Sequence, residues 1–255
     1  MGWVKTKAEL DAHYALRVRE FNGAKMLGVM FLTTHEVVKS VLPPPLEPID
    51  QPAGLMFIAE YPDTNLGPGY REAALFLRCQ YSGEQGTYCL AMPIDSQELR
   101  MINGREIYGF PKKMATIGLE RNNEQVTGWV ERMGIKFVEI KASMQSTLPQ
   151  LPPTGPTFLF KAMPSADLTP GFDGPVLLVR QQTEVEMVSL EIGVAEVVFQ
   201  KSSYDPWFEI PIENVVAAFY LVSNNRMHPG KVIAEVDPQS YLPYSFKGID
   251  FFSGV

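Results

Sequence analysis

The feature that most constrains the fold is a succession of short strand-like runs that meet at tight turns. The clearest pair, 125–132 and 135–143, meets at Met133 and Gly134, and a second pair, 73–81 and 87–92, flanks a turn-like run. Strands joined by such short turns pair antiparallel, because parallel strands need a longer crossover. The pattern continues in further runs at 26–33, 55–61, 112–119, 157–161, 176–180, 183–190 and 193–200. We therefore predict a β-rich α+β fold of antiparallel strands in a barrel-like sheet with a few flanking helices.

Short helices are predicted by capping boxes, in which Thr or Asp precedes Glu by three residues. The boxes begin at Thr6, Thr33 and Asp95. We expect the first helix to extend to about Arg17 and the second to stop at the prolines 43–45. The third is expected to end near Gly104, because glycine suits a left-handed cap. Apolar spacing predicts a further helix at 212–222, packed on the sheet.

Two irregular stretches bear on the number of domains. Residues 62–69, rich in Pro, Gly, Asp and Asn, are expected to form a loop. The proline-rich stretch 146–156 resembles a linker, but strand-like runs resume directly after it. We therefore predict one domain over residues 1–255, whose 45% hydrophobic residues support a large core. The aromatic tail, 240–255, is expected to dock on its own subunit or on a neighbour.

Charge and hydropathy narrow the function classes. The net charge of −7, without a larger basic cluster than one Lys-Lys pair, argues against a nucleic-acid partner. Apolar runs fall far short of a membrane span, so no membrane association is expected. The N-terminus lacks the apolar core of a secretory signal, and we expect a cytoplasmic protein.

Neither cysteine nor histidine indicates a metal site. The three histidines are far apart in the sequence, and two cysteines are too few for a zinc site or a disulfide framework. If the hairpin at 73–92 is centred on Glu84, Cys79 faces Cys89 across it, near enough for contact. Two small buried thiols are the favoured interpretation, because disulfides are rare inside cells.

Chemistry is indicated by residues 104–115, which read Gly-Arg-Glu-Ile-Tyr-Gly-Phe-Pro-Lys-Lys-Met-Ala. A lysine is nucleophilic only as the neutral amine, and apolar surroundings favour that form. If Lys112 and Lys113 are extended, their side chains point to opposite faces, so Lys113 does not act on Lys112 by direct contact. Desolvation by Tyr108, Phe110 and the barrel interior is then the larger effect. The alternative is a loop that holds both ammonium groups in water.

The lysine segment resembles the signature of the acetoacetate decarboxylase family, in which Gly-Arg-Glu is followed by Pro-Lys-Lys. Three further segments are similar to family segments: Leu-Pro-Pro-Pro-Leu-Glu at 42–47, Gly-Tyr-Arg-Glu at 69–72, and Phe-Glu-Ile-Pro-Ile-Glu-Asn-Val-Val at 208–216. The resemblance covers about residues 20 to 235 and is strongest at the lysine segment.

This resemblance implies a lyase that needs no cofactor. Acetoacetate decarboxylases are an established example of an activated lysine. The likeness makes Lys112 the residue that forms a Schiff base with a small keto acid, most simply acetoacetate or a related β-keto acid. It makes Glu72 the residue that shuttles protons. Arg105 belongs to the signature, either in the site or in a structural ion pair. The resemblance also implies a cone-shaped barrel and a homo-oligomer.

The sequence departs from the decarboxylase pattern at two pocket positions. The family's active-site arginine falls on Ala24, with Lys25 adjacent only if the register slips, and its second glutamate falls on Phe57. An arginine there would bind the substrate carboxylate, so a bulkier or less charged keto substrate is expected. Two alternatives stay open: a Schiff-base aldolase or dehydratase acting on pyruvate-like substrates, and a non-catalytic barrel that binds an apolar ligand.

Overall fold

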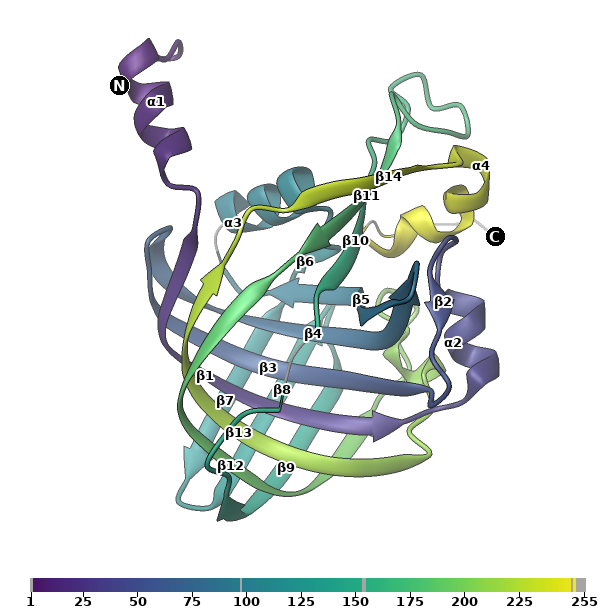
Figure 1. Ribbon diagram of the computed structural model, residues 1–255. Helices are drawn as coiled ribbons and strands as arrows, with labels where there is room; N and C mark the ends of the chain where they lie inside the picture. Colours follow the sequence, from purple (N-terminus) through teal and green to yellow (C-terminus); the bar gives the residue numbers. More distant parts are fainter. Residues whose placement is uncertain (1, 97, 153–154, 249, 251–255) are drawn as a thin grey trace.

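One strongly curled sheet makes up most of the molecule (Figure 1). The computed structural model describes residues 2–96, 98–152, 155–248 and 250. Within these residues the sheet has 14 strands, in the order β14-β11-β10-β5-β4-β3-β1-β13-β12-β9-β8-β7, with β2 beside β4 and β6 beside β5. Pairs are antiparallel except β5–β6 and β5–β10. The predicted β-rich, largely antiparallel fold is confirmed.

The strands are β1 (Arg19–Leu32), β2 (Glu47–Pro48), β3 (Ala53–Thr64), β4 (Gly67–Tyr81), β5 (Glu84–Ile94), β6 (Lys112–Met114), β7 (Thr116–Asn122), β8 (Gln125–Arg132), β9 (Ile135–Thr147), β10 (Thr157–Lys161), β11 (Val176–Gln181), β12 (Thr183–Phe199), β13 (Asn214–Met227) and β14 (Lys231–Val236).

The main core lies between two halves of the sheet that face each other, since β7 contacts β3 and β4 and β8 contacts β1 (Figure 1). Apolar side chains from both halves fill it, including Leu27, Leu75 and Phe137. A Cβ at Gly128 would lie 2.8 Å from Cδ1 of Ile58, so this glycine lets β8 approach β3 closely.

A second apolar cluster covers the opposite face of the same strands. On β4, Ala73 and Leu75 point into the main core, whereas Tyr70, Ala74 and Phe76 belong to the second cluster. Because side chains alternate along a strand, Glu72 shares the face of the second cluster. This face carries the candidate site.

Helices are few and short. They are α1 (Lys7–Ala15), α2 (His35–Val41), α3 (Glu98–Ile102) and α4 (Pro238–Tyr241), with a π-helical turn at Asn103–Tyr108 and 3-10 helices at Trp207–Glu209 and Leu242–Gly248. Thr6 and Glu9 form the predicted capping box of α1. That helix buries none of its residues and projects from the sheet (Figure 1). The cap of α2 is Thr34, one residue after the expected start. No helix in the described ranges is long and apolar enough to cross a membrane.

Several sequence predictions about local structure are wrong. The predicted helix at 212–222 is instead strand β13, which pairs with β1 on one side and β12 on the other. Its apolar run fits both the helical period and the two-residue period of a strand, and pairing with β1 and β12 selects the strand. The predicted loop at 62–69 is mostly strand, because β3 continues to Thr64 and β4 begins at Gly67. The two runs at 183–200 form one strand, β12.

The two cysteines do not face each other. The hairpin of β4 and β5 turns at Ser82 and Gly83, so Cys79 pairs with Gly86 and Cys89 pairs with Phe76. Cys79 belongs to the main core and Cys89 to the second cluster, on opposite faces of the sheet. The expectation of two buried thiols is confirmed, and burial raises the pKa of the Cys79 thiol to about 12.

The chain's C-terminal part packs on its own sheet. The Tyr241 ring stacks on the Phe160 ring with centroids 4.7 Å apart. This contact agrees with the prediction that the aromatic tail docks on its own subunit. Phe251 and Phe252, on which that prediction also drew, lie outside the described residues.

Candidate active site

Lys112 and Glu72, forty residues apart in the sequence, meet on one face of the sheet. Both flank strand β5, where Glu72 pairs with Ile94 and Lys112 with Met92. The Lys112 ammonium donates a hydrogen bond to Oε2 of Glu72, and each side chain is only 7% exposed. The two residues predicted to be catalytic are therefore a buried ion pair.

The π-helical turn Asn103–Tyr108 fixes the position of the lysine. A Cβ at Gly104 would overlap with Cε and Cδ of Lys112, so the glycine allows the lysine stem to lie against the turn. The turn ends at Gly109, whose φ of 89° lies in the left-handed region. The sequence prediction placed this cap at Gly104. Continuing to Gly109 carries the chain into Phe110 and then into β6.

Aromatic rings enclose the amine. Nζ of Lys112 lies 5.7 Å from the centroid of the Tyr70 ring and 6.0 Å from that of Phe110. Tyr108 is buried beside Phe110, with centroids 6.1 Å apart. Burial, and then the negative charge of Glu72, raise the pKa of Tyr70 well above its ordinary value. The phenol therefore keeps its proton and can donate a hydrogen bond.

A cavity of about 80 Å³ opens onto this pair. Its lining includes Tyr70, Glu72, Arg100, Tyr108, Phe110 and Lys112. Sequence reasoning missed Tyr70 and Arg100. Tyr70 stands two residues before Glu72, the spacing that places both on one face of a strand. Arg100 gives no comparable signal in the sequence, because adjacent residues of a helix do not share a face.

Lys113 points away from the cavity, as strand geometry predicted. Its ammonium lies 3.3 Å from Asp205 and 3.0 Å from Asp250, and it donates to the Tyr204 carbonyl at 2.6 Å. Arg132 pairs with the same two carboxylates. These contacts tie β6 and β8 to the C-terminal tail, so the role of Lys113 in this structure is structural.

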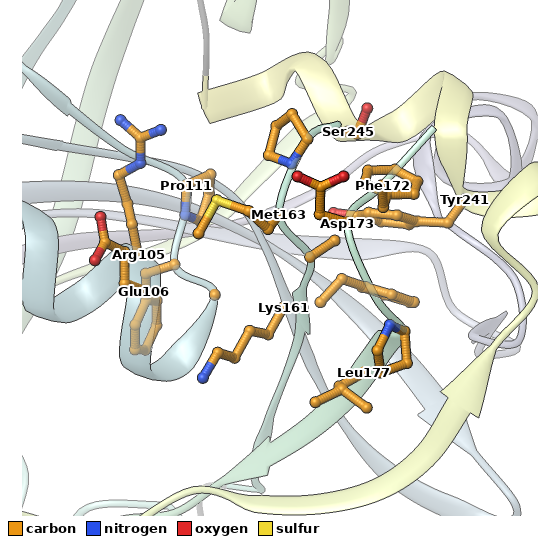
Figure 2. A pocket seen from close by; sticks show the side chains of 16 residues that line it. Arg105, Glu106, Pro111, Lys161, Met163, Phe172, Asp173, Leu177, Tyr241 and Ser245 are labelled. Carbon is orange, nitrogen blue, oxygen red and sulfur yellow. The ribbon is translucent and has the colours of Figure 1, made fainter. Parts of the chain in front are cut away.

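Arg105 lines a different pocket, of about 280 Å³ (Figure 2). Figure 2 shows Arg105 and Glu106 on one side of it, with Phe172, Asp173 and Tyr241 on the other. Phe110 lines both cavities, whereas Arg105 lines only the larger one and Lys112 only the smaller one. Arg105 is thus not brought to the lysine.

Ala24 and Phe57 belong to the second apolar cluster, but neither lines the Lys112 cavity. The Phe57 ring stacks on Phe76, with centroids 5.7 Å apart. Lys25 does not replace the missing arginine, because its ammonium pairs with Glu60 at 3.4 Å and remains half exposed. The expectation of a bulkier or less charged keto substrate rested on Ala24 and Phe57. It finds no support in the lining of this cavity, which contains neither residue.

Comparisons with known proteins find relatives of this chain in sequence and in fold. A relative from Burkholderia cenocepacia named acetoacetate decarboxylase is 27% identical over 222 residues, covering 84% of this chain and 87% of the relative. The solved acetoacetate decarboxylase of Legionella pneumophila superposes with a TM-score of 0.77 at 19% identity, covering 92% of this chain and 99% of that chain.

A second solved structure is the enduracididine biosynthesis enzyme MppR, complexed with the condensation product of pyruvate and imidazole 4-carboxaldehyde. It has a TM-score of 0.72 at 17% identity and covers 84% of this chain and 88% of that chain. At such identities the two structures establish the fold. The sequence profile of the family described as Acetoacetate decarboxylase (ADC) matches residues 6–236, and the chain therefore belongs to the acetoacetate decarboxylase family.

Proposed function

We propose that this protein is a Schiff-base lyase that decarboxylates a small β-keto acid such as acetoacetate. The observation that carries the proposal is the buried Lys112–Glu72 pair at a small cavity with aromatic walls. An amine and a carboxylate in direct contact can exchange a proton without water. Transfer from the ammonium to Glu72 yields the neutral amine that attacks a ketone.

In the proposed reaction, the amine and the ketone first form an iminium ion, which then lets the bond to the carboxylate break. The amine of Lys112 adds to the ketone carbon, and a proton passes from its nitrogen to the oxygen to give a hydroxyl group. Glu72 then returns its proton to this hydroxyl, so that water leaves and an iminium ion forms. The positively charged nitrogen accepts the electron pair of the bond to the carboxylate, and CO₂ departs. The resulting enamine takes a proton from solvent at carbon, and addition of water to the iminium ion so formed releases the ketone and the lysine. Tyr70, which keeps its proton, supplies a hydrogen-bond donor beside these steps.

The relative named acetoacetate decarboxylase supports decarboxylation. A second candidate uses the same enamine to attack an aldehyde, as an aldolase followed by dehydration. The observation that favours it is the shared fold of MppR, whose structure holds a condensation product of pyruvate and an aldehyde. A barrel that only binds a ligand would form no imine.

Reductive trapping tests the proposal. Borohydride added during incubation with acetoacetate is expected to leave an isopropyl group on Lys112, located by peptide fragmentation. Lys112→Gln should prevent the adduct. Lys113→Gln should keep it, because that side chain lies on the other face. An unmodified wild-type protein would contradict the proposal. Evolution of CO₂ from acetoacetate, compared with carbon–carbon bond formation from pyruvate and an aldehyde, separates the two enzymes.

A further inference from the structure

We propose that Arg100 binds the carboxylate of the keto acid, so that carboxylate recognition comes from helix α3 and not from position 24. The inference rests on the proposed function, because it assumes that the ketone reacts at Lys112. It assigns the substrate class as small keto acids that carry their negative charge beside Arg100.

Arg100 has the burial and the unused donors of an anion-binding residue. Its side chain lines the Lys112 cavity and the residue is 3% exposed. Nη2 donates to the Pro68 carbonyl and, at 3.4 Å, to Oγ1 of Thr64. Nε and Nη1 are buried with no hydrogen-bond partner among the described residues. Buried charged donors without acceptors are costly, and a carboxylate is the partner that a guanidinium binds best.

Contacts with the Tyr70 ring set an upper limit on the distance between the guanidinium and the amine. Its central carbon is 4.4 Å from the centroid of the Tyr70 ring, and Nζ of Lys112 is 5.7 Å from the same centroid. The two cations therefore lie at most about 10 Å apart, the sum of those distances. A short keto acid can place its ketone carbon at Nζ and its carboxylate toward Arg100 within this span.

Neighbouring cations fit the role less well. Lys25 and Arg71 both pair with Glu60, and neither lines the cavity. Arg19 lines the cavity but is only partly buried. Burial lowers the pKa of Arg100, while Tyr70 and Glu72 act against that shift. A guanidinium nevertheless stays charged near neutral pH.

The chemistry predicts which kinetic constant Arg100 controls. Carbon dioxide is neutral, so an arginine paired with the carboxylate loses its partner's charge as the bond breaks. Arg100 therefore stabilises bound substrate at least as well as the transition state, and its contribution appears in KM more than in kcat. When Arg100 and its charge-assisted hydrogen bonds are removed, KM is expected to rise about 10- to 100-fold.

The test compares charged and neutral ketones on one lysine. Adduct formation at Lys112 under borohydride is measured against the concentration of acetoacetate, pyruvate or acetone. Wild-type protein is expected to react at lower concentrations of the keto acids than of acetone. Arg100→Gln should lose about 10- to 100-fold of that preference, measured as the ratio of keto-acid trapping to acetone trapping in the same variant. Arg100→Lys should restore part of it, and Arg180→Gln, paired with Glu84 on the surface, should behave as wild type.

A second readout needs no imine. Butyrate, which resembles acetoacetate without the ketone, is expected to raise the melting temperature of the wild type and of Arg180→Gln, but not of Arg100→Gln. Equal keto-acid preference and equal butyrate stabilisation in Arg100→Gln and wild type would overturn the assignment. If wild-type protein traps no ketone at all, the Schiff-base proposal fails, and the butyrate experiment still decides whether Arg100 binds carboxylates.

Discussion

At the scale of single residues, Lys112 begins its proposed reaction as half of an ion pair. The sequence predicted an amine made neutral by apolar walls, and the walls are present in Tyr70, Tyr108 and Phe110. The structure adds a carboxylate in direct contact. In the proposed reaction the amine gives its proton to this carboxylate, so we treat the lysine and the glutamate as one unit.

Replacing Glu72 with glutamine is expected to lower turnover of acetoacetate by about 10²–10⁴-fold, because the amine loses its proton acceptor. Borohydride trapping at Lys112 should slow with it. Glu72→Asp keeps the charge on a shorter side chain, and its turnover should lie between that of Glu72→Gln and that of the wild type. Glu84→Gln is a matched control on the surface. Turnover of Glu72→Gln within about threefold of wild type would exclude the glutamate from proton transfer.

At the scale of elements, β6 separates its two lysines by strand alternation. One side chain enters the cavity and the other enters the ion network of Asp205 and Asp250. The π-helical turn before β6 sets how deeply the first lysine lies. Such turns are rare and occur often at functional sites.

Substituting Gly104 with alanine tests the turn. The added methyl group would overlap with Cε and Cδ of Lys112, so the stem that holds the amine against Glu72 must shift. We expect trapping at Lys112 to fall by about tenfold or more, since a displacement of about 1 Å is costly in catalysis. Glu106→Ala, in the same turn with an exposed side chain, should trap at the wild-type rate. Unchanged trapping in Gly104→Ala, measured on folded protein, would show that the close contact is unimportant.

At the scale of the whole molecule, Asp250 connects the tail to the sheet through Lys113 and Arg132. The hydrogen bond from Arg132, followed by that from Lys113, lowers the pKa of the Asp250 carboxyl below its ordinary value of 3.8. A lowered pKa in the folded state means that the carboxylate stabilises the fold at pH values above the ordinary one. That stabilisation is lost as the pH falls through the folded value.

Asp250→Asn is therefore expected to lower the free energy of unfolding by about 1–3 kcal/mol at pH 7. The difference from wild type should stay constant down to about pH 5 and shrink below about pH 4. Urea unfolding across this pH range measures it, with Asp63→Asn as an exposed control. A difference that grows toward acid pH would contradict the proposed origin.

The predicted homo-oligomer is a separate expectation, which light scattering can check.

Two local sequence signals predicted local structure correctly. The hairpin of β8 and β9 lies where the turn at Met133 and Gly134 placed it, and α1 begins at its capping box. These features depend on residues close together in the chain. Residues 104–113 likewise hold several groups of the candidate site close together in the chain, namely Gly104, two aromatic residues and the amine of Lys112.

Only the tertiary structure decided the contacts between distant segments. The helical prediction at 212–222 failed because its apolar run fits two periods, and β1 and β12 select the strand. The partnership of Lys112 with Glu72 depends on how β4 and β6 flank β5, and the burial of Arg100 depends on Pro68 and Tyr70 from β4. Sequence by itself determined which groups are present, since chemistry belongs to residues. Their distances follow from strand register, which distant partners set.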